Sequence, residues 1–279
     1  MGGWLSLMVI IAVAGREAMR ELAVFQVMLM RSLIGLVMLY PLMYAAGGIG
    51  AMRSGRLLNH GVRNAVHYAA QYGWFVALTL IPLAQVVAIE FTMPIWTALL
   101  AVAFLGERMN AWKALAVLLG LVGVGLIVRP AASGISAGQA IALVAALGFA
   151  VSVTMTKSLT RTDGAVQIIF WMLVVQSVIG LVPALAVWRW PSAGVWGWVL
   201  LIAFCGTFSH YCMTRAMRHA DATVVVPMDF LRVPLTALAG WLVYAEGIDL
   251  FTIAGTALIL GGNLLNLRRA AGRPPQPGR

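Results

Sequence analysis

The sequence predicts an all-α, polytopic membrane protein with ten transmembrane helices arranged as two inverted five-helix repeats. Of its 279 residues, 62% are hydrophobic and only 10% are charged. A soluble domain is about 45–50% apolar and about 25% charged, and a soluble fold of this size could not cover so much apolar surface. Soluble enzymes, disordered chains and coiled coils are therefore excluded.

Ten apolar blocks follow one another along the chain, each near the roughly 20 residues that a spanning helix needs. They lie at residues 3–20, 22–46, 62–81, 83–105, 110–129, 135–157, 165–188, 194–214, 221–244 and 249–267. A polar linker at 47–61, Pro82, Pro130 and the TRTDG segment at 160–164 separate several of them. We therefore expect short loops and one membrane domain with no soluble one.

The first block is the shortest, because only Trp4–Ala14 is continuously apolar before the charged segment REAMRE. Two explanations stay open. Either this amphipathic turn completes the helix inside the protein, or the helix starts slightly upstream.

The net charge of +10 would suggest a nucleic-acid partner in a soluble protein. Here the basic residues lie between apolar blocks, which is typical of the positive-inside bias of membrane loops. If the N-terminus is cytoplasmic, most of the 19 Lys and Arg residues, with Arg63 counted among them, fall in inner loops. We expect cytoplasmic N- and C-termini in a bacterial-type inner (plasma) membrane, and no nucleic-acid partner.

An internal repeat supports the division into halves. A shift of 139 residues places Ala84–Gly125 on Thr223–Leu264, with Glu90 on Asp229 and Glu107 on Glu246. Each half then holds five spans, and an odd number makes the second half enter from the opposite side of the membrane. Inverted repeats are the architecture of alternating-access carriers, whose substrate site lies near the midplane between the halves.

The segment ALTLIPLAQVVAIEFTMPIWTALLAVAFLGERMNAWKALAVLLGLVGVGLIVRP at 77–130 resembles the EamA signature of the drug/metabolite transporter superfamily. A short turn leads to a span with a central proline, then to LGER and a glycine-rich helix. Residues 216–265 repeat this pattern, and residues 15–36 are similar to the first hairpin of the family, with an arginine inside the second span. The resemblance covers nearly the whole chain.

This resemblance implies a first EamA repeat at 1–130, a second at 131–269 and a cytoplasmic tail at 270–279, which we expect to be disordered. It also implies a central cavity lined mainly by helices 1, 3, 4, 6, 8 and 9, with helices 5 and 10 bracing the outside. Within the superfamily, the sequence is most similar to branches associated with riboflavin or S-adenosylmethionine uptake. The short first span departs from the pattern and puts the N-terminal part of the cavity lining in question.

Four charged residues fall within the predicted spans, where charge is costly and faces a cavity or a partner. They are Arg31, Glu90, Asp229 and Arg232. One interpretation makes Glu90 and Asp229 an acidic pair that binds a cationic or amino group, or a coupling proton. The other makes all four a structural ion-pair network that holds helices 2, 4 and 9 together.

Two polar stripes are candidates for the cavity wall. In the third block Asn64, His67, Gln71 and Trp74 recur at helical spacing, and such a stripe should not face lipid. In the eighth block Phe204, Thr207, Tyr211 and Thr214 do the same, with His210 beside them. Interhelical hydrogen bonding and ordinary packing are the alternatives for the two stripes.

Phe230 adds an aromatic candidate that would suit a flat, amphipathic solute, and Pro94 and Pro234 are expected to bend two spans beside the acidic pair. Glu107 and Glu246 are expected to act as helix-end polar groups, with Asp249 capping the next helix. No metal site is expected, because His67 has no second ligand at a fitting spacing.

We therefore expect a secondary transporter of a small organic metabolite, such as an amino acid, vitamin, nucleoside-type or drug-like solute, working by alternating access without a cofactor. The partners are the small-molecule substrate and the lipid bilayer, with a proton as a candidate coupling ion and a homodimer as a candidate assembly. A channel or a non-transporting scaffold is the alternative. A membrane-embedded enzyme using His219 is a remote one, because no nucleophile or metal set accompanies it.

Overall fold

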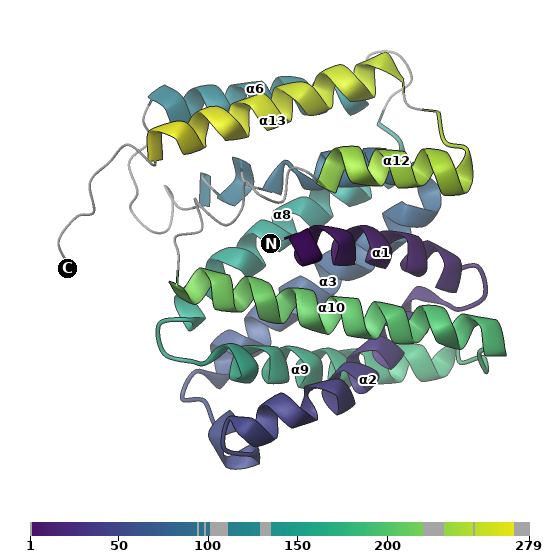
Figure 1. The fold of residues 1–279 in the computed structure, drawn as a ribbon, viewed down its shortest axis with the longest axis vertical. Coiled ribbons are helices and arrows are strands. Elements are labelled where there is room, and N and C mark those ends of the chain that lie inside the picture. The colour runs from purple at the N-terminus through teal and green to yellow at the C-terminus, as the bar shows by residue number, and fades with distance from the viewer. Residues whose placement is uncertain are drawn as a thin grey trace.

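The computed structural model describes residues 2–93, 95–97, 99–100, 111–128, 135–219, 232–247 and 249–270. Throughout these residues the regular structure is helical (Figure 1). The α-helices are α1 Gly2–Ala18, α2 Val24–Ala45, α3 Leu57–Leu80, α4 Leu83–Glu90, α6 Ala111–Val128, α8 Ala137–Leu159, α9 Ala165–Ala186, α10 Ala193–His219, α12 Arg232–Tyr244 and α13 Leu250–Ala270, and a 3-10 helix, η1, covers Ile49–Met52.

Composition fits a membrane environment. Four helical segments are long and apolar enough to cross a bilayer: α2, α8, α9 and Ala193–Arg215 of α10. Shorter apolar helical segments lie at Leu83–Thr97, Val117–Ile127 and Leu250–Gly262. The outer faces carry bare aliphatic side chains, such as Val37 and Val182, each 74% exposed. The chain is therefore a multi-pass membrane protein.

The helix boundaries bear on one open question and change one expectation. Helix α1 continues into the charged segment as far as Ala18, which agrees with the explanation in which this segment completes the first helix. Helix α3 begins at Leu57, five residues before the predicted block, so Arg63 lies in the second turn of the helix rather than at its edge, and it is buried. Counting Arg63 as a loop residue was therefore wrong. The later part of the predicted fourth span and the first part of the ninth lie outside the described residues.

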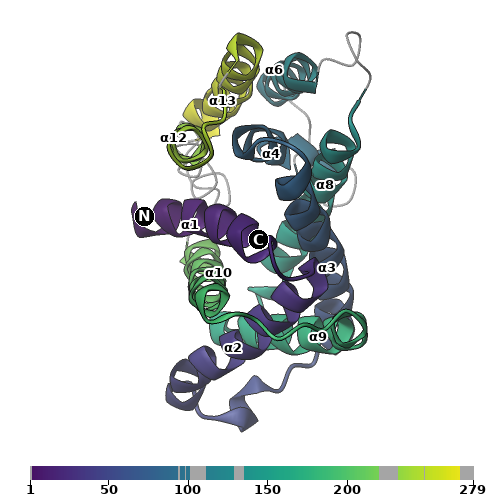
Figure 2. The ribbon, with the colours of Figure 1, turned by 90° about the vertical axis from the view of Figure 1, so that its right-hand side faces the viewer.

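The main helix–helix contacts of the described residues are exchanged among themselves when the first five predicted spans are swapped with the last five. Helix α3 packs on α8 as α1 packs on α10, and α2 contacts α10 as α9 contacts α3. Three further pairs, α2 with α9, α4 with α12 and α6 with α13, map onto themselves. Figure 2 shows α1 and α10 on one side of the molecule and α3 and α8 on the other.

Loops gather at two opposite ends (Figure 1). The Asp163 end consists of residues 46–56 and 160–164, and the Glu246 end consists of residues 19–23, 81–82, 187–192 and 245–249. Hydrogen bonds join Ser54 to Asp163 at the first end, and Glu21 to Ser192 at the second. Helix α1 runs toward the Glu246 end, whereas its repeat counterpart α8 runs toward the Asp163 end. The matched helices therefore point in opposite directions.

Glycines bring α6 and α13 into close contact. A Cβ on Gly123 would lie 2.5 Å from the carbonyl oxygen of Gly255, and a Cβ on Gly255 would lie 2.5 Å from that of Gly123. The two helices thus pack backbone against backbone, as small residues allow in membranes. No described residue of either helix lines the central cavity, which is consistent with the expected position of helices 5 and 10 on the outside.

Candidate functional site

A cavity lies at the centre of the described helices and takes its wall from α1, α2, α3, α4, α8 and α10. Its lining residues are Met8, Ile11, Arg31, Arg63, His67, Gln71, Trp74, Glu90, Met93, Phe149, Ser152, Val153, Gly206, His210 and Met213. The helix set agrees with the expected helices 1, 3, 4, 6 and 8, and α2 adds Arg31. The first part of the predicted ninth span, residues 221–231, lies outside the described residues.

Helix α3 supplies one continuous polar stripe to this wall. Arg63, His67, Gln71 and Trp74 follow spacings of four, four and three residues, which places them on one helical face. The structure thus puts three of the predicted candidates in the cavity wall and adds Arg63. The sequence could have identified Arg63 as a member of this stripe, because it lies one helical turn before His67.

Asn64, the other member of the predicted stripe, lies beside the cavity rather than in its wall. It is fully buried, and its Oδ1 accepts a hydrogen bond of 2.6 Å from Nη1 of Arg63. Asn64 therefore supports the arginine.

The two arginines are almost fully buried, with 2% of each exposed. Arg31 donates from Nη2 to Oε1 of Gln176 at 2.8 Å, and Arg63 donates from Nε to Oγ1 of Thr156 at 3.0 Å. Within the described residues neither forms an ion pair with a carboxylate. The expected pairing of Arg31 with acidic residues is therefore not seen there.

Glu90 is the carboxylate that the described part of the wall contributes. It is the last residue of α4, and its Oε2 accepts a hydrogen bond of 2.8 Å from Nε1 of Trp74. Trp74 is 7% exposed and has the edge of Phe75 against its ring. Two of the predicted candidates, Glu90 and Trp74, thus lie in direct contact.

Two histidines face each other in the wall. The rings of His67 and His210 meet edge to face at 5.0 Å, and Phe149 lies against His67 at 5.5 Å. Nδ1 of His67 lies 3.2 Å from Oγ of Ser152, whereas Nε2 of His67, Nδ1 of His210 and Oε1 of Gln71 have no hydrogen-bond partner among the described residues. Buried polar atoms normally have partners, so these atoms are available to a solute.

Helix α10 presents a different face to the cavity from the expected one. Gly206, His210 and Met213 line the wall, and the predicted Phe204, Thr207 and Tyr211 do not. Thr207 packs against α2, because a Cβ on Gly35 would lie 2.5 Å from its Oγ1. Phe204 is 49% exposed and stacks on Phe208, which in turn stacks on Tyr211.

The remaining candidates cannot be placed in the wall from the described residues. Asp229, Phe230 and Pro94 lie outside those residues. Arg232 begins α12 and Pro234 follows in its first turn, but their side chains are not described.

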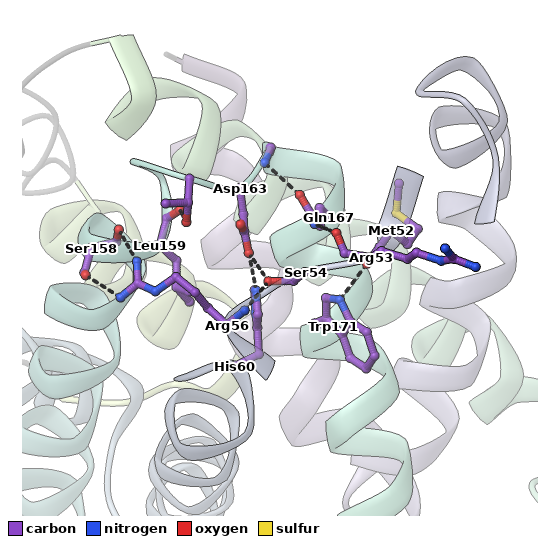
Figure 3. A network of polar contacts seen from close by, with 12 residues as sticks. Met52, Arg53, Ser54, Arg56, His60, Ser158, Leu159, Asp163, Gln167 and Trp171 are labelled. Carbon is purple, nitrogen blue, oxygen red and sulfur yellow. Dashed lines mark hydrogen bonds and ion pairs between the residues drawn. The ribbon is translucent and has the colours of Figure 1, made fainter. Parts of the chain in front are cut away.

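A polar network fastens the Asp163 end (Figure 3). Asp163 accepts hydrogen bonds from Ser54 at 2.6 Å and pairs with Nε2 of His60 at 2.6 Å. Arg56 donates to the backbone and side-chain oxygens of Ser158. Burial alone would raise the pKa of Asp163, but hydrogen bonds from Ser54, His60 and Thr162 outweigh burial and hold that pKa below its ordinary value.

Hydrogen bonds also join the loop at the Asp163 end to α9. Nε2 of Gln167 donates to the carbonyl oxygen of Arg53, and Nε1 of Trp171 donates to that of Met52 at 2.8 Å. The loop before α3 is therefore bound to both helices that flank residues 160–164 (Figure 3).

A second network fastens the Glu246 end. Glu246 forms an ion pair with Arg16 of α1 and accepts a hydrogen bond of 2.9 Å from the backbone N–H of Leu83, the first residue of α4. Arg16 also donates to the carbonyl oxygen of Ile81. Glu246 thus caps α4 across the molecule, while Asp249 caps the next helix by accepting from the N–H of Thr252 at 2.7 Å.

Comparison with known proteins agrees with this architecture. The sequence profile of the EamA-like transporter family matches residues 5–129 and 136–268. A riboflavin transporter of Brucella anthropi is 30% identical over 249 residues, covering 86% of each chain. A pseudopaline exporter, CntI, of Pseudomonas aeruginosa is 29% identical over 252 residues, covering 88% of this chain and 86% of the relative. A solved crystal structure shares the fold with a TM-score of 0.72 at 18% identity, covering 97% of both chains.

Proposed function

Since the chain belongs to the EamA-like transporter family and is a secondary transporter of a small metabolite, we propose that its cargo is a flat, amphipathic heteroaromatic compound. The observation that carries this proposal is the central cavity, whose wall combines aromatic rings with buried polar atoms that lack protein partners. Ligand sites have this character: mostly apolar walls with a few polar groups that fix orientation.

The aromatic side chains of the wall suit a planar ring. Trp74, Phe149 and the facing pair of His67 and His210 supply ring faces and edges, against which an aromatic solute packs favourably. Gln71 offers an amide oxygen to an N–H group of the solute. The similarity to a riboflavin transporter makes the flavin ring the natural test compound.

We propose further that transport proceeds by alternating access between two repeats, residues 1–130 and 131–269. The opposite direction of matched helices and the exchangeable packing pattern support this mechanism. So do the two polar networks, one at each end of the cavity, because a carrier needs a separate closure on each side of its site. The bias of basic loop residues supports cytoplasmic termini in a bacterial-type inner membrane.

Glu90 is the described group best placed to couple transport to protons. Its carboxylate lines the cavity and accepts from the indole of Trp74, so a cargo that engages Trp74 would compete for that hydrogen bond. Glu90→Gln keeps the shape and removes the titratable group. If a proton moves with the cargo through Glu90, this variant loses the pH dependence of uptake while wild type keeps it.

Proteoliposomes test the transport proposal directly. We expect riboflavin uptake to saturate with concentration and to show counterflow, in which unlabelled riboflavin inside accelerates entry of labelled riboflavin. A channel would show neither behaviour in that concentration range, and a scaffold would show no flux above empty liposomes. Absence of saturable flux for riboflavin and for a panel of other heteroaromatic metabolites would contradict the proposal.

A further inference from the structure

We propose that Arg31 and Arg63 form an oxyanion subsite in the cavity, so that the cargo carries a carboxylate or a phosphate group. This inference rests on the proposed function, because it concerns the same cavity. It goes further by assigning a charge to the cargo and by naming the two residues that recognise that charge.

The surroundings of Arg31 leave part of its guanidinium group able to bind a ligand. The guanidinium is 2% exposed and lines the cavity. Gln176 accepts one hydrogen bond from Nη2, and Nε has no partner in the part of the chain that the structure describes. A glycine on α10 allows this helix to approach the guanidinium closely, since a Cβ on Gly206 would lie 3.2 Å from Nη1 of Arg31.

Arg63 reaches the same cavity from α3 and is held by neutral oxygens. Its Nε donates to Thr156 and its Nη1 to Asn64. Thr156 itself donates to the carbonyl oxygen of Ser152 on α8, so the guanidinium is anchored to two helices. Because Thr156 and Asn64 are uncharged, these hydrogen bonds do not neutralise the positive charge of Arg63. They do hold the guanidinium group in a fixed orientation.

Two buried guanidiniums without a carboxylate are costly, because charges taken out of water need a partner of opposite sign. In the described part of the wall the carboxylate is that of Glu90, which is bonded to Trp74. Trp74 is eleven residues beyond Arg63 on α3, about 16 Å along the helix axis. Among the residues that the structure describes, neither guanidinium has a carboxylate partner, and in our proposal an oxyanion of the cargo supplies that negative charge.

Neighbouring donors complete the subsite. His67 lies one turn from Arg63 on α3, and His210 faces it from α10. Each has a ring nitrogen without a protein partner. Arginine forks match the geometry of carboxylate and phosphate oxygens, and an imidazole N–H adds a further donor. Along α3 the cavity thus presents Arg63 and His67 toward the Asp163 end, and Trp74, with the carboxylate of Glu90 bonded to it, toward the Glu246 end.

Three flavins that share one ring test this inference on the purified full-length protein. They are riboflavin, which is neutral, riboflavin 5′-phosphate, and 10-carboxymethylflavin, which carries a carboxylate. Quenching of flavin fluorescence gives the dissociation constant of each. We expect at least one of the anionic flavins to bind tenfold or more tightly than riboflavin, and the stronger of the two identifies the oxyanion.

Arg31→Gln and Arg63→Gln remove the charge and keep a donor. Each variant should raise the dissociation constant of the preferred anionic flavin at least tenfold. The dissociation constant of riboflavin should change less than twofold. Arg215→Gln, an exposed arginine beyond the cavity, is the matched control and should change neither. Equal losses for neutral and anionic flavins, or no preference for an anion in wild type, would overturn the inference while leaving transport of a neutral flavin intact.

Benzoate and benzamide separate failure of the subsite from failure of the flavin proposal. If no flavin binds, thermal stabilisation by benzoate but not by benzamide, lost in both arginine variants, supports the subsite alone. If benzoate has no effect either, the subsite is rejected.

Discussion

At the scale of single residues, Gly206 controls how closely α10 approaches Arg31. A methyl group at this position would lie 3.2 Å from Nη1, which is tighter than an ordinary contact, so the guanidinium must move. We expect Gly206→Ala to raise the KM for transport several-fold with little change in the thermal stability of the protein. Proteoliposome uptake measures the first quantity and a melting curve in detergent the second.

Gly125→Ala is the matched control, because a Cβ there meets nothing within 4 Å. An unchanged KM in Gly206→Ala would show that Arg31 does not contact the cargo in the orientation seen here.

Trp74 joins an aromatic surface to the carboxylate of Glu90. Trp74→Phe keeps a ring and removes the Nε1 donor, which bonds Glu90 at 2.8 Å. Hydrogen bonds to charged groups contribute about 1.5–3 kcal/mol, so transport should lose about tenfold in kcat/KM. Trp96→Phe also removes an indole donor, one that bonds the neutral hydroxyl of Thr92 in the segment after α4, and serves as the control. Equal effects in the two variants would contradict a special role for Trp74.

At the scale of elements, the sequence predicted the α3 stripe better than the α10 face. Polar residues are conspicuous in an apolar helix, so His67 and Gln71 identify the side of α3 that faces the cavity. On α10 polar and aromatic residues occur on two faces, and their spacing alone supports either one. The close approach of Gly35 to Thr207, which decides the rotation, involves a residue on another helix. Tertiary contacts of this kind are not visible in the spacing of one segment.

Helix pair α6 and α13 should depend on its glycines for stability and not for transport chemistry. Gly123→Leu inserts a side chain where a Cβ already lies 2.5 Å from the backbone of Gly255. Overpacking of this kind costs about 1–3 kcal/mol or more. We expect a clearly lower melting temperature, and any protein that remains folded should keep its KM, because α6 does not line the cavity.

Gly261→Leu is the control for this prediction, since Gly261 has open space around it. A raised KM in the folded fraction of Gly123→Leu would contradict the bracing role.

The network at the Asp163 end gives stability a defined pH dependence. Hydrogen bonds hold the folded-state pKa of Asp163 below its ordinary value, so the ionised form favours folding. This contribution is complete at pH 7, begins to fall as the pH approaches the unfolded value of about 3.9, and is lost below the lowered folded pKa. We expect Asp163→Asn to melt at a lower temperature than wild type at pH 7.

The same difference should shrink when both proteins are melted near pH 3. Arg161→Gln, an exposed change in the same loop, should match wild type at both pH values. A difference for Asp163→Asn that stays constant from pH 7 to pH 3 would show that the carboxylate charge does not contribute.

At the scale of the whole molecule, the prediction of ten spans rests on composition and on the repeat, because both are properties of the entire chain. Apolar blocks predict the helices, and an odd number of spans per half predicts their opposite direction. The sequence could not predict which polar groups close the ends. Glu246 had the appearance of a local cap, and its contacts with Arg16 and Leu83 join segments more than 160 residues apart.

The two end networks should close opposite sides of one cavity. Val153→Cys, in a background with Cys205 and Cys212 replaced by Ala, places one thiol in the cavity wall. A membrane-impermeant maleimide added to right-side-out or inverted vesicles reports access from each side. Glu246→Gln weakens the pair with Arg16 and should speed labelling from one side only. Asp163→Asn weakens the contacts with Ser54 and His60 and should speed labelling only from the other.

This pattern separates a carrier from a pore, because a carrier opens to one side at a time and a pore is open to both. Equal labelling of the wild-type thiol from the two sides would indicate a continuous channel. Acceleration of labelling from the same side by both variants would contradict the assignment of the networks to opposite ends. Opposite shifts, together with slower uptake in both variants, are expected if each network must form and break once in every transport cycle.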